Sequence, residues 1–257
     1  GNITQGGVAL TVGGTSSFRT LANNADIVLD QASNAFTGAV SLNTTGSSGN
    51  ATLVAAAGLN LAASTIGGTL HATARSGNML DSGNLVVGGA ATFITGANNA
   101  DITLNNTNAL TGAVTLSTTG STGHATIDNG TTALNLATST VGGNLTLTSG
   151  HYIIDSSTVT VGGNLVATTD AANGSIHMDG LRVDGTVQLT TNGTGNATVV
   201  NDAGLNFVTA TVGGNLAATA TAGNMTDSGT LTITGTTTLT TSANDATIAL
   251  DTTTNAF

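Results

Sequence analysis

Residues 141–147 read Val-Gly-Gly-Asn-Leu-Thr-Leu, and this short pattern organises the whole chain. Counted from its second glycine, an apolar residue lies two positions before, and apolar residues usually follow at two and four positions after. Apolar residues at every second position indicate a strand with one buried face. The pattern recurs around ten anchor glycines, namely Gly14, Gly38, Gly68, Gly89, Gly112, Gly143, Gly163, Gly185, Gly214 and Gly235.

The spacing of the anchors reveals a second, longer repeat. Neighbouring anchors lie 20–31 residues apart, and the intervals recur in groups of three that span 72–75 residues. The long units cover residues 1–76, 77–150, 151–222 and a truncated 223–257. Solenoids usually end in polar capping repeats, and neither end of this chain shows one. We therefore expect a single solenoid segment over 1–257, cut from a longer chain.

A strand with one apolar face cannot bury that face alone, so successive coils must stack in parallel and cover one another. The sequence predicts an all-β fold, a parallel β-helix or β-solenoid of about ten coils in a three-coil super-repeat. We expect the anchor glycines to mark corners where the backbone approaches the core.

Composition excludes several classes of protein. The 257 residues carry a formal net charge of -10, with 3 basic residues, all arginine, and 13 acidic ones, all aspartate. This balance excludes nucleic-acid binding, which needs a basic surface. The absence of cysteine excludes disulfide scaffolds, thiol catalysis and cysteine metal sites. A hydrophobic content of 39% argues against disorder. No apolar run reaches the ~18 residues of a membrane span, so we expect no membrane insertion.

The repeats also resemble a known family. The stretches Thr140-Val-Gly-Gly-Asn-Leu-Thr-Leu-Thr, Val161-Gly-Gly-Asn-Leu-Val-Ala-Thr and Thr211-Val-Gly-Gly-Asn-Leu-Ala-Ala-Thr are similar to repeats of filamentous-haemagglutinin-like exoproteins and related bacterial surface adhesins. The resemblance covers all ten coils and implies a right-handed parallel β-helix, exported and displayed as a long fibre. The chain departs from that family in its regular super-repeat, its lack of lysine and its lack of the amino-terminal secretion domain.

One stretch is chemically more varied than the rest. In residues 177–184, the alternation turns His177, Asp179, Arg182 and Asp184 outward around a glycine turn. Two carboxylates near an arginine could bind or cleave a glycan. Because no matching carboxylates are expected in neighbouring coils, we interpret the stretch as a solvated corner with a weak surface ion pair.

The remaining polar residues suggest structural roles. Asp81, Asp155 and Asp227 recur at the same place in successive long units. Three coils separate them, too far to share a metal ion, so we interpret them as turn-forming residues. His71, His124, His151 and His177 lie in different coils without metal-ligand spacing. The sequence thus indicates no metal site, no cofactor and no enzyme.

These patterns predict a structural stalk or fibre segment of a large secreted or cell-surface bacterial protein. Its expected partners are neighbouring coils, copies of the same chain end to end, or surface glycans of host or neighbouring cells. Three alternatives stay open: a self-stacking extracellular filament subunit, a polysaccharide-binding or polysaccharide-cleaving β-helix, and an ice-binding solenoid. The ice-binding alternative is weakened because the outward threonine ranks are broken by pairs such as Asn164 and Val166.

Overall fold

A computed structural model describes all residues 1–257, and every regular element in it is a strand. The fold is an all-β parallel β-solenoid of about twelve turns without any helix, as the sequence predicts. Accordingly, no helix is present that could cross a membrane. The chain divides into two compact units, Gly1–Gly130 and Thr131–Phe257, which are described separately.

The first unit consists of two parallel sheets. One sheet takes a single strand from each turn, in the order β1, β4, β7, β10, β13 and β16, and the other contains β3, β6, β8, β9, β11, β12, β14, β15 and β17. A short additional pair joins β2 and β5. The bounds are β1 Ile3–Thr4, β2 Thr11–Val12, β3 Ser16–Asn23, β4 Ile27–Leu29, β5 Ala35–Phe36, β6 Val40–Thr45, β7 Ala51–Ala55, β8 Leu59–Leu61, β9 Ser64–Ile66, β10 Leu70–Ala74, β11 Met79–Asp81, β12 Leu85–Val87, β13 Ala91–Asn98, β14 Ile102–Leu104, β15 Ala109–Leu110, β16 Ala113–Thr119 and β17 Ala125–Asp128.

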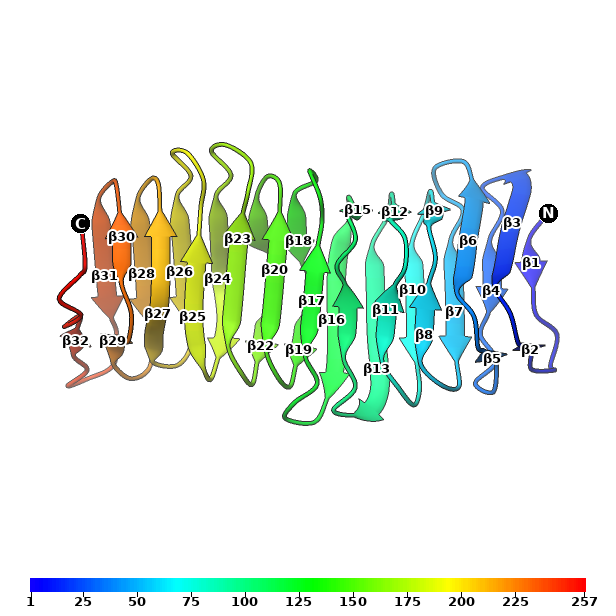
Figure 1. Ribbon diagram of the computed structural model, residues 1–257, viewed down its shortest axis with the longest axis horizontal. Helices are drawn as coiled ribbons and strands as arrows, with labels where there is room; N and C mark the ends of the chain where they lie inside the picture. The colour runs from blue at the N-terminus through cyan, green and yellow to red at the C-terminus, as the bar shows by residue number, and fades with distance from the viewer. The chain divides into compact units, whose positions relative to one another are not determined.

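The second unit repeats this design, and Figure 1 shows its two sheets as a front and a back layer of arrows. One sheet contains β18, β19, β21, β22, β24, β26, β28 and β31, and the other contains β20, β23, β25, β27, β29, β30 and β32. The bounds are β18 Leu134–Leu136, β19 Ser139–Val141, β20 Leu145–Ser149, β21 Ile153–Asp155, β22 Val159–Val161, β23 Leu165–Thr169, β24 Ile176–Val183, β25 Thr186–Thr190, β26 Ala197–Asn201, β27 Leu205–Val212, β28 Leu216–Ala220, β29 Met225–Asp227, β30 Leu231–Ile233, β31 Thr237–Thr241 and β32 Ile248–Ala249.

The core of each unit is built from in-register columns of inward side chains. On β7, β10 and β13, for example, Ala72 pairs with Leu53 on one side and Phe93 on the other. All three side chains are fully buried. A small residue between two large ones lets the column fill the space evenly, which supports dense packing. The alternation of inward and outward residues predicted from the sequence is therefore confirmed.

The strands that follow the anchor glycines do not all lie in one sheet. In the first unit, β3 and β6 belong to one sheet, whereas β10, β13 and β16 belong to the other. In the second unit, β20, β23 and β25 likewise share one sheet, and β28 and β31 share the opposite one. The long intervals, from Gly38 to Gly68 and from Gly185 to Gly214, therefore cover one and a half turns.

This half-turn step changes the size of the super-repeat. Within each unit, the anchors one super-repeat apart, Gly14 and Gly89 or Gly163 and Gly235, are separated by three and a half turns rather than the expected three coils. The solenoid consequently has about twelve turns, more than the ten anchors indicate. Equivalent residues in the two successive repeats of a unit lie on opposite sheets.

The anchor glycines lie at corners, where each turn rests on the turn before it. The backbone N–H of Gly89 donates to the Gly68 carbonyl at 2.8 Å, and that of Gly185 donates to the Gly163 carbonyl at 3.0 Å. After the half-turn step, Gly68 N–H instead donates to the Gly49 carbonyl at 2.9 Å. Gly49 precedes β7, which lies in the same sheet as β10, the strand after Gly68. The close backbone approach expected at the anchors is thus observed at Gly68, Gly89 and Gly185, whereas a Cβ atom on Gly14, in the first turn, would meet nothing within 4 Å.

Candidate functional site

Asparagine and aspartate side chains form ladders along the corners of both units. In the first unit, Asp26 N–H donates to Asn2 Oδ1 at 3.0 Å, Asn50 N–H to Asp26 Oδ1 at 2.8 Å, and Thr69 N–H to Asn50 Oδ1 at 2.8 Å. In the second, Asn215 N–H donates to Asn196 Oδ1 at 2.8 Å. Each side chain accepts a hydrogen bond from the following turn, so these ladders connect successive turns beyond the sheets.

A second set of amides lies inside the solenoid. Asn108 and Asn201 are at most 1% exposed. Asn201 Oδ1 accepts from Val183 N–H at 2.7 Å, while its Nδ2 donates to the carbonyls of Val183 and Gly204 at 3.0 and 2.7 Å. Buried polar groups are costly unless they are hydrogen bonded. These asparagines therefore contribute to the structure by joining one turn to the next.

The repeated aspartates Asp81, Asp155 and Asp227 are at most 9% exposed. Asp81 accepts hydrogen bonds from Asn105 N–H at 3.1 Å and from Asn108 Nδ2 at 2.9 Å, one turn further along. Asp227 accepts from the backbone N–H of the next turn in the same way, at 3.1 Å. From the sequence alone, these aspartates are expected to form turns and to satisfy backbone donors in corners; in the structure they end strands, and the backbone donors that they satisfy belong to the next turn of the solenoid.

Asp155 differs from Asp81 because backbone groups alone hold it. Its two carboxylate oxygens accept hydrogen bonds from Asp179 N–H and Gly180 N–H, each at 3.0 Å. Burial raises the pKa of Asp155 above its ordinary value, and the neighbouring Asp179 carboxylate raises it further. The two backbone hydrogen bonds act in the opposite direction and lower the pKa. The net effect is a raised pKa in a buried carboxyl group.

Above this carboxylate, β24 carries three of the four outward residues singled out from the sequence. His177 Nε2 lies 3.5 Å from Asp179 Oδ2, and Arg182 Nη1 lies 3.9 Å from Asp202 Oδ2. The side chains of these two pairs, His177 with Asp179 and Arg182 with Asp202, are all more than half exposed. Both contacts are therefore solvated, and exposed ion pairs of this kind contribute little stability.

Asp202 is a residue that sequence reasoning missed. Asp179 and Asp202 line one surface hollow of about 220 Å³, together with Thr158, Gly180, Leu181, Val200 and Thr221. The expectation that no carboxylate in a neighbouring coil would join the cluster is therefore wrong. The pairing of Leu181 on β24 with Asn201 on β26 places Arg182 and Asp202 next to each other. The sequence shows Asp202 only once this register is known.

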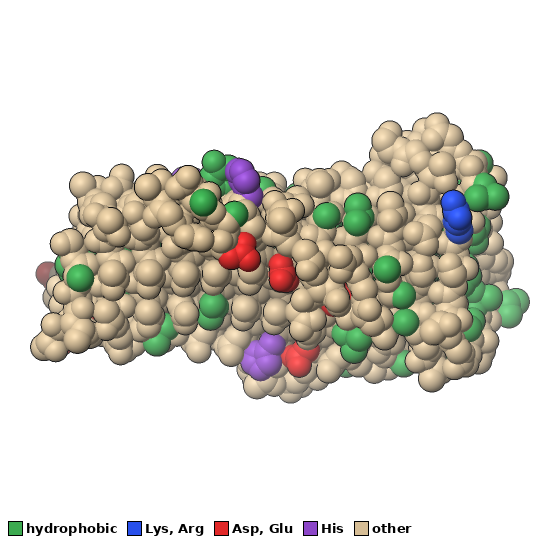
Figure 2. All heavy atoms as spheres, turned by 45° about the horizontal axis from the view of Figure 1, so that its top comes forward, with side chains coloured by type: hydrophobic (Ala, Val, Ile, Leu, Met, Phe, Trp, Pro, Cys, Tyr) green, Lys and Arg blue, Asp and Glu red, His purple; other side chains and the backbone are tan.

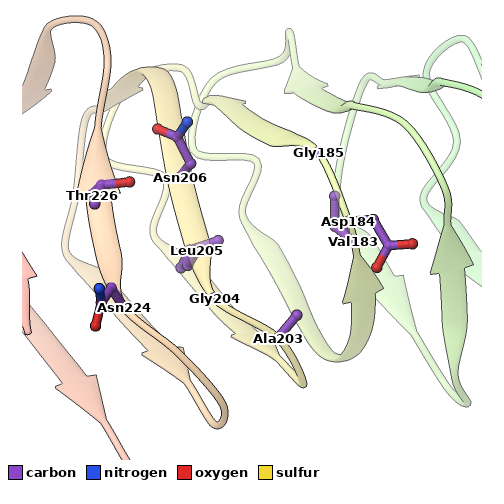
Figure 3. Close-up of a pocket in the computed structure, with 9 residues that line it drawn as sticks. All are labelled: Val183, Asp184, Gly185, Ala203, Gly204, Leu205, Asn206, Asn224 and Thr226. Carbon is purple, nitrogen blue, oxygen red and sulfur yellow. The ribbon is translucent and has the colours of Figure 1, made fainter. Parts of the chain in front are cut away.

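Asp184 does not join this group. It lines a separate hollow of about 270 Å³ with Val183, Gly185, Ala203, Gly204, Leu205, Asn206, Asn224 and Thr226. Figure 3 shows Asp184 at one side of that hollow and Asn224 and Thr226 at the other. The four candidate residues therefore divide between two places on the surface.

Charged side chains are sparse elsewhere as well. Figure 2 shows a face dominated by uncharged polar side chains and backbone, with single acidic, basic and histidine side chains scattered over it. No group of three or more His, Cys, Asp or Glu side chains lies close enough to hold a metal ion. His151 instead packs edge-on against Tyr152, with ring centroids 4.1 Å apart.

A family model of repeats matches the chain at residues 1–43, 48–117, 122–190 and 194–257. Each gap between matches begins at a buried threonine, Thr44, Thr118 or Thr191, whose hydroxyl donates to a carbonyl four or five residues on and closes a corner loop. The matched repeats recur with about the same period as the long units but in a different phase, because the matches begin at residues 48, 122 and 194 whereas the long units begin at 77, 151 and 223. Comparison with curated proteins and with solved structures found no match. Because the family model covers most of its length, the chain belongs to the family described as "Repeats of unknown function (DUF5649)".

Proposed function

We propose that the chain is a structural stalk or fibre segment of a large secreted or cell-surface bacterial protein of the adhesin kind. The observation that carries this proposal is the continuity of hydrogen bonding between turns within each unit. Parallel sheets, corner ladders and buried asparagines all join one turn to the next, as at Asn50 and Asn201. Such a design adds length by adding turns, which suits a spacer better than a catalyst.

The composition supports the same role. The core consists of apolar columns such as Leu53, Ala72 and Phe93, and the only buried residues of a charged type are the three repeated aspartates that accept hydrogen bonds from the next turn. The formal net charge of -10 on the chain opposes lateral aggregation. The resemblance of the Gly-Gly-Asn-Leu repeats to those of filamentous-haemagglutinin-like exoproteins supports export and an extracellular location. The proposal includes no cofactor, no nucleic acid and no membrane insertion.

Negative-stain electron microscopy across a concentration series, with light scattering for mass, tests the stalk against its closest alternative. A stalk segment is expected to remain monomeric, with particles of one length at every concentration. Fibres of constant width that lengthen with concentration would contradict the proposal, and would make the chain a self-stacking filament subunit.

The extracellular location has its own test. An antibody against residues 1–257 is expected to label intact cells of the source bacterium or their culture medium. Labelling that appears only after the cells are permeabilised would overturn this part of the proposal.

A second candidate function is the binding or cleavage of a polysaccharide, favoured by the hollow that Asp179 and Asp202 share. Glycan hydrolysis commonly uses two carboxylates that flank the scissile bond. Incubation with acidic and neutral polysaccharides, followed by product analysis, tests this candidate. Product formation that is lost in Asp179→Asn and Asp202→Asn, but kept in the control Asp184→Asn, would establish an enzyme. Absence of product from every substrate would contradict cleavage.

A further inference from the structure

Three polar residues lie side by side on the outward face of the first unit. Arg19 on β3 pairs with Asn43 on β6, and Asn43 pairs in turn with Thr65 on β9. Together with Ser17, Thr44 and Thr45 they line a surface hollow of about 420 Å³. Every residue lining this hollow is polar, and one is a cation.

The guanidinium of Arg19 has no hydrogen-bond or ion-pair partner within the protein, unlike those of the other two arginines. Arg75 donates to the Ala32 carbonyl at 3.2 Å, and Arg182 lies 3.9 Å from an Asp202 carboxylate oxygen. No carboxylate lies within ion-pair distance of Arg19. In a chain of net charge -10, the Arg19 guanidinium is thus left free to meet an external anion.

The fold itself does not require an arginine at this place. In the second unit, the corresponding row on β23, β25 and β27 consists of Thr168, Thr190 and Thr211, paired in the same register. Three threonines therefore satisfy the same backbone that carries Arg19, Asn43 and Thr65. The arginine therefore provides the first unit with a positively charged hydrogen-bond donor that the solenoid does not need for folding.

The hollow also offers uncommitted hydrogen-bonding groups. Asn43 Oδ1 accepts from Thr65 N–H at 3.2 Å and its Nδ2 donates to Ser41 Oγ at 2.8 Å, which leaves one amide N–H free. The hydroxyls of Ser17 and Thr65 have no hydrogen-bond partner within the protein, whereas the Thr45 hydroxyl donates to the Thr20 carbonyl at 2.8 Å. One guanidinium thus faces the solvent beside an amide and two hydroxyls.

We propose that this hollow binds a carboxylate-bearing saccharide. The planar guanidinium of Arg19 suits a carboxylate, which it can hold through two parallel hydrogen bonds. The Asn43 amide and the Ser17 and Thr65 hydroxyls suit the ring hydroxyls of the same sugar, because each can exchange hydrogen bonds with them. This binding function is additional to the stalk and does not depend on it.

Titration with glucuronate, followed by two-dimensional NMR of the labelled protein, tests the site. Glucose serves as the neutral probe, because it differs from glucuronate only in carrying a hydroxymethyl group in place of the carboxylate, and inorganic phosphate serves as the simple anion. Glucuronate is expected to shift resonances of Arg19, Asn43 and Thr65 saturably. Glucose is expected to bind at least about tenfold more weakly, since charge-assisted bonds to the guanidinium are lost. Phosphate that binds as tightly as glucuronate would overturn the assignment to a saccharide.

Variants locate the site. Arg19→Thr reproduces the row of the second unit and is expected to weaken glucuronate binding at least about tenfold while leaving the unfolding midpoint unchanged. Arg19→Lys keeps the charge but loses the paired donors, so it is expected to weaken binding as well. Thr168→Ala, in the equivalent row, is the matched control and should bind as the parent chain does. Unchanged affinity in both Arg19 variants, or equal loss in Thr168→Ala, would overturn the proposal.

Discussion

A Cβ atom on Gly38 would lie 2.4 Å from the carbonyl carbon of Gly14, one turn away. The corner is therefore closed to any side chain at this position, because the atom in the way belongs to backbone that the sheets hold in place. Gly14 carries the same sequence pattern, yet a Cβ atom there would meet nothing within 4 Å. The difference arises because Gly38 lies against the turn that contains Gly14, whereas Gly14 lies in the first turn of this sequence and has no earlier turn against it.

Gly38→Ala is expected to destabilise the protein by about 1–3 kcal/mol, as overpacking of a rigid site generally does. Gly14→Ala is the matched control, and its free energy of unfolding is expected to stay the same or rise by up to about 1 kcal/mol, because alanine restricts the unfolded chain. Urea unfolding followed by circular dichroism measures both. Equal stability of the two variants would show that the corners do not depend on contact between glycines.

Asn201→Ala is expected to cost about 2–4 kcal/mol, because it leaves the Val183 N–H and the carbonyls of Val183 and Gly204 without their buried partner. Asn192→Ala is the control, since Asn192 is exposed and its side chain makes a single hydrogen bond, from Nδ2 to the Asp170 carbonyl. Thermal unfolding should separate the two variants clearly. A loss no larger than that of Asn192→Ala would mean that the inner amides are dispensable.

The strands, their parallel stacking and the inward columns could all be predicted from the sequence, because a two-residue alternation marks a buried face directly. The half-turn step could not. A strand such as β10 shows the same alternation whichever sheet it joins, so the pattern around Gly68 does not indicate to which sheet the strand belongs. Only the longer interval from Gly38 to Gly68 is consistent with the half-turn step, and that interval is equally compatible with a longer loop.

The surface sites were harder to predict for a related reason. Residues that meet across turns are set by strand register, and register depends on local irregularities such as the shift between Met178 and Leu181. Alternation alone placed Asp179 and Arg182 outward correctly. It could not show that Asp202 lies beside them or that Asp184 belongs to another hollow.

Arg182→Ala and Asp202→Ala are each expected to change the free energy of unfolding by less than about 1 kcal/mol. The two side chains are 59% and 54% exposed and 3.9 Å apart, so water and salt screen their attraction. A double-mutant cycle in urea measures the coupling. A coupling energy clearly above 1 kcal/mol would show that the pair stabilises the hollow around it.

Asp155 should make stability depend on pH in a direction opposite to that of a salt-bridged carboxylate. Its pKa in the folded chain is raised above the ordinary 3.8, chiefly by burial, so the folded state binds the proton more tightly than the unfolded state. The resulting stabilisation is complete below pH 3.8 and is lost as the pH rises through the folded pKa. Asp155→Asn removes this titration and should therefore gain stability relative to the parent chain as the pH rises.

Urea unfolding of the parent chain and of Asp155→Asn between pH 3 and pH 7 measures this difference, because the titrating groups other than Asp155 and its coupled neighbour Asp179 are common to both chains and cancel. Asp155→Ala separates titration from hydrogen bonding. It loses both acceptors for Asp179 N–H and Gly180 N–H, so it should be less stable than Asp155→Asn at every pH. Its difference from the parent chain should nevertheless change with pH by the same amount. A parent chain that gains stability relative to both variants as the pH rises would reverse the sign, and would mean that the two backbone hydrogen bonds outweigh burial at Asp155.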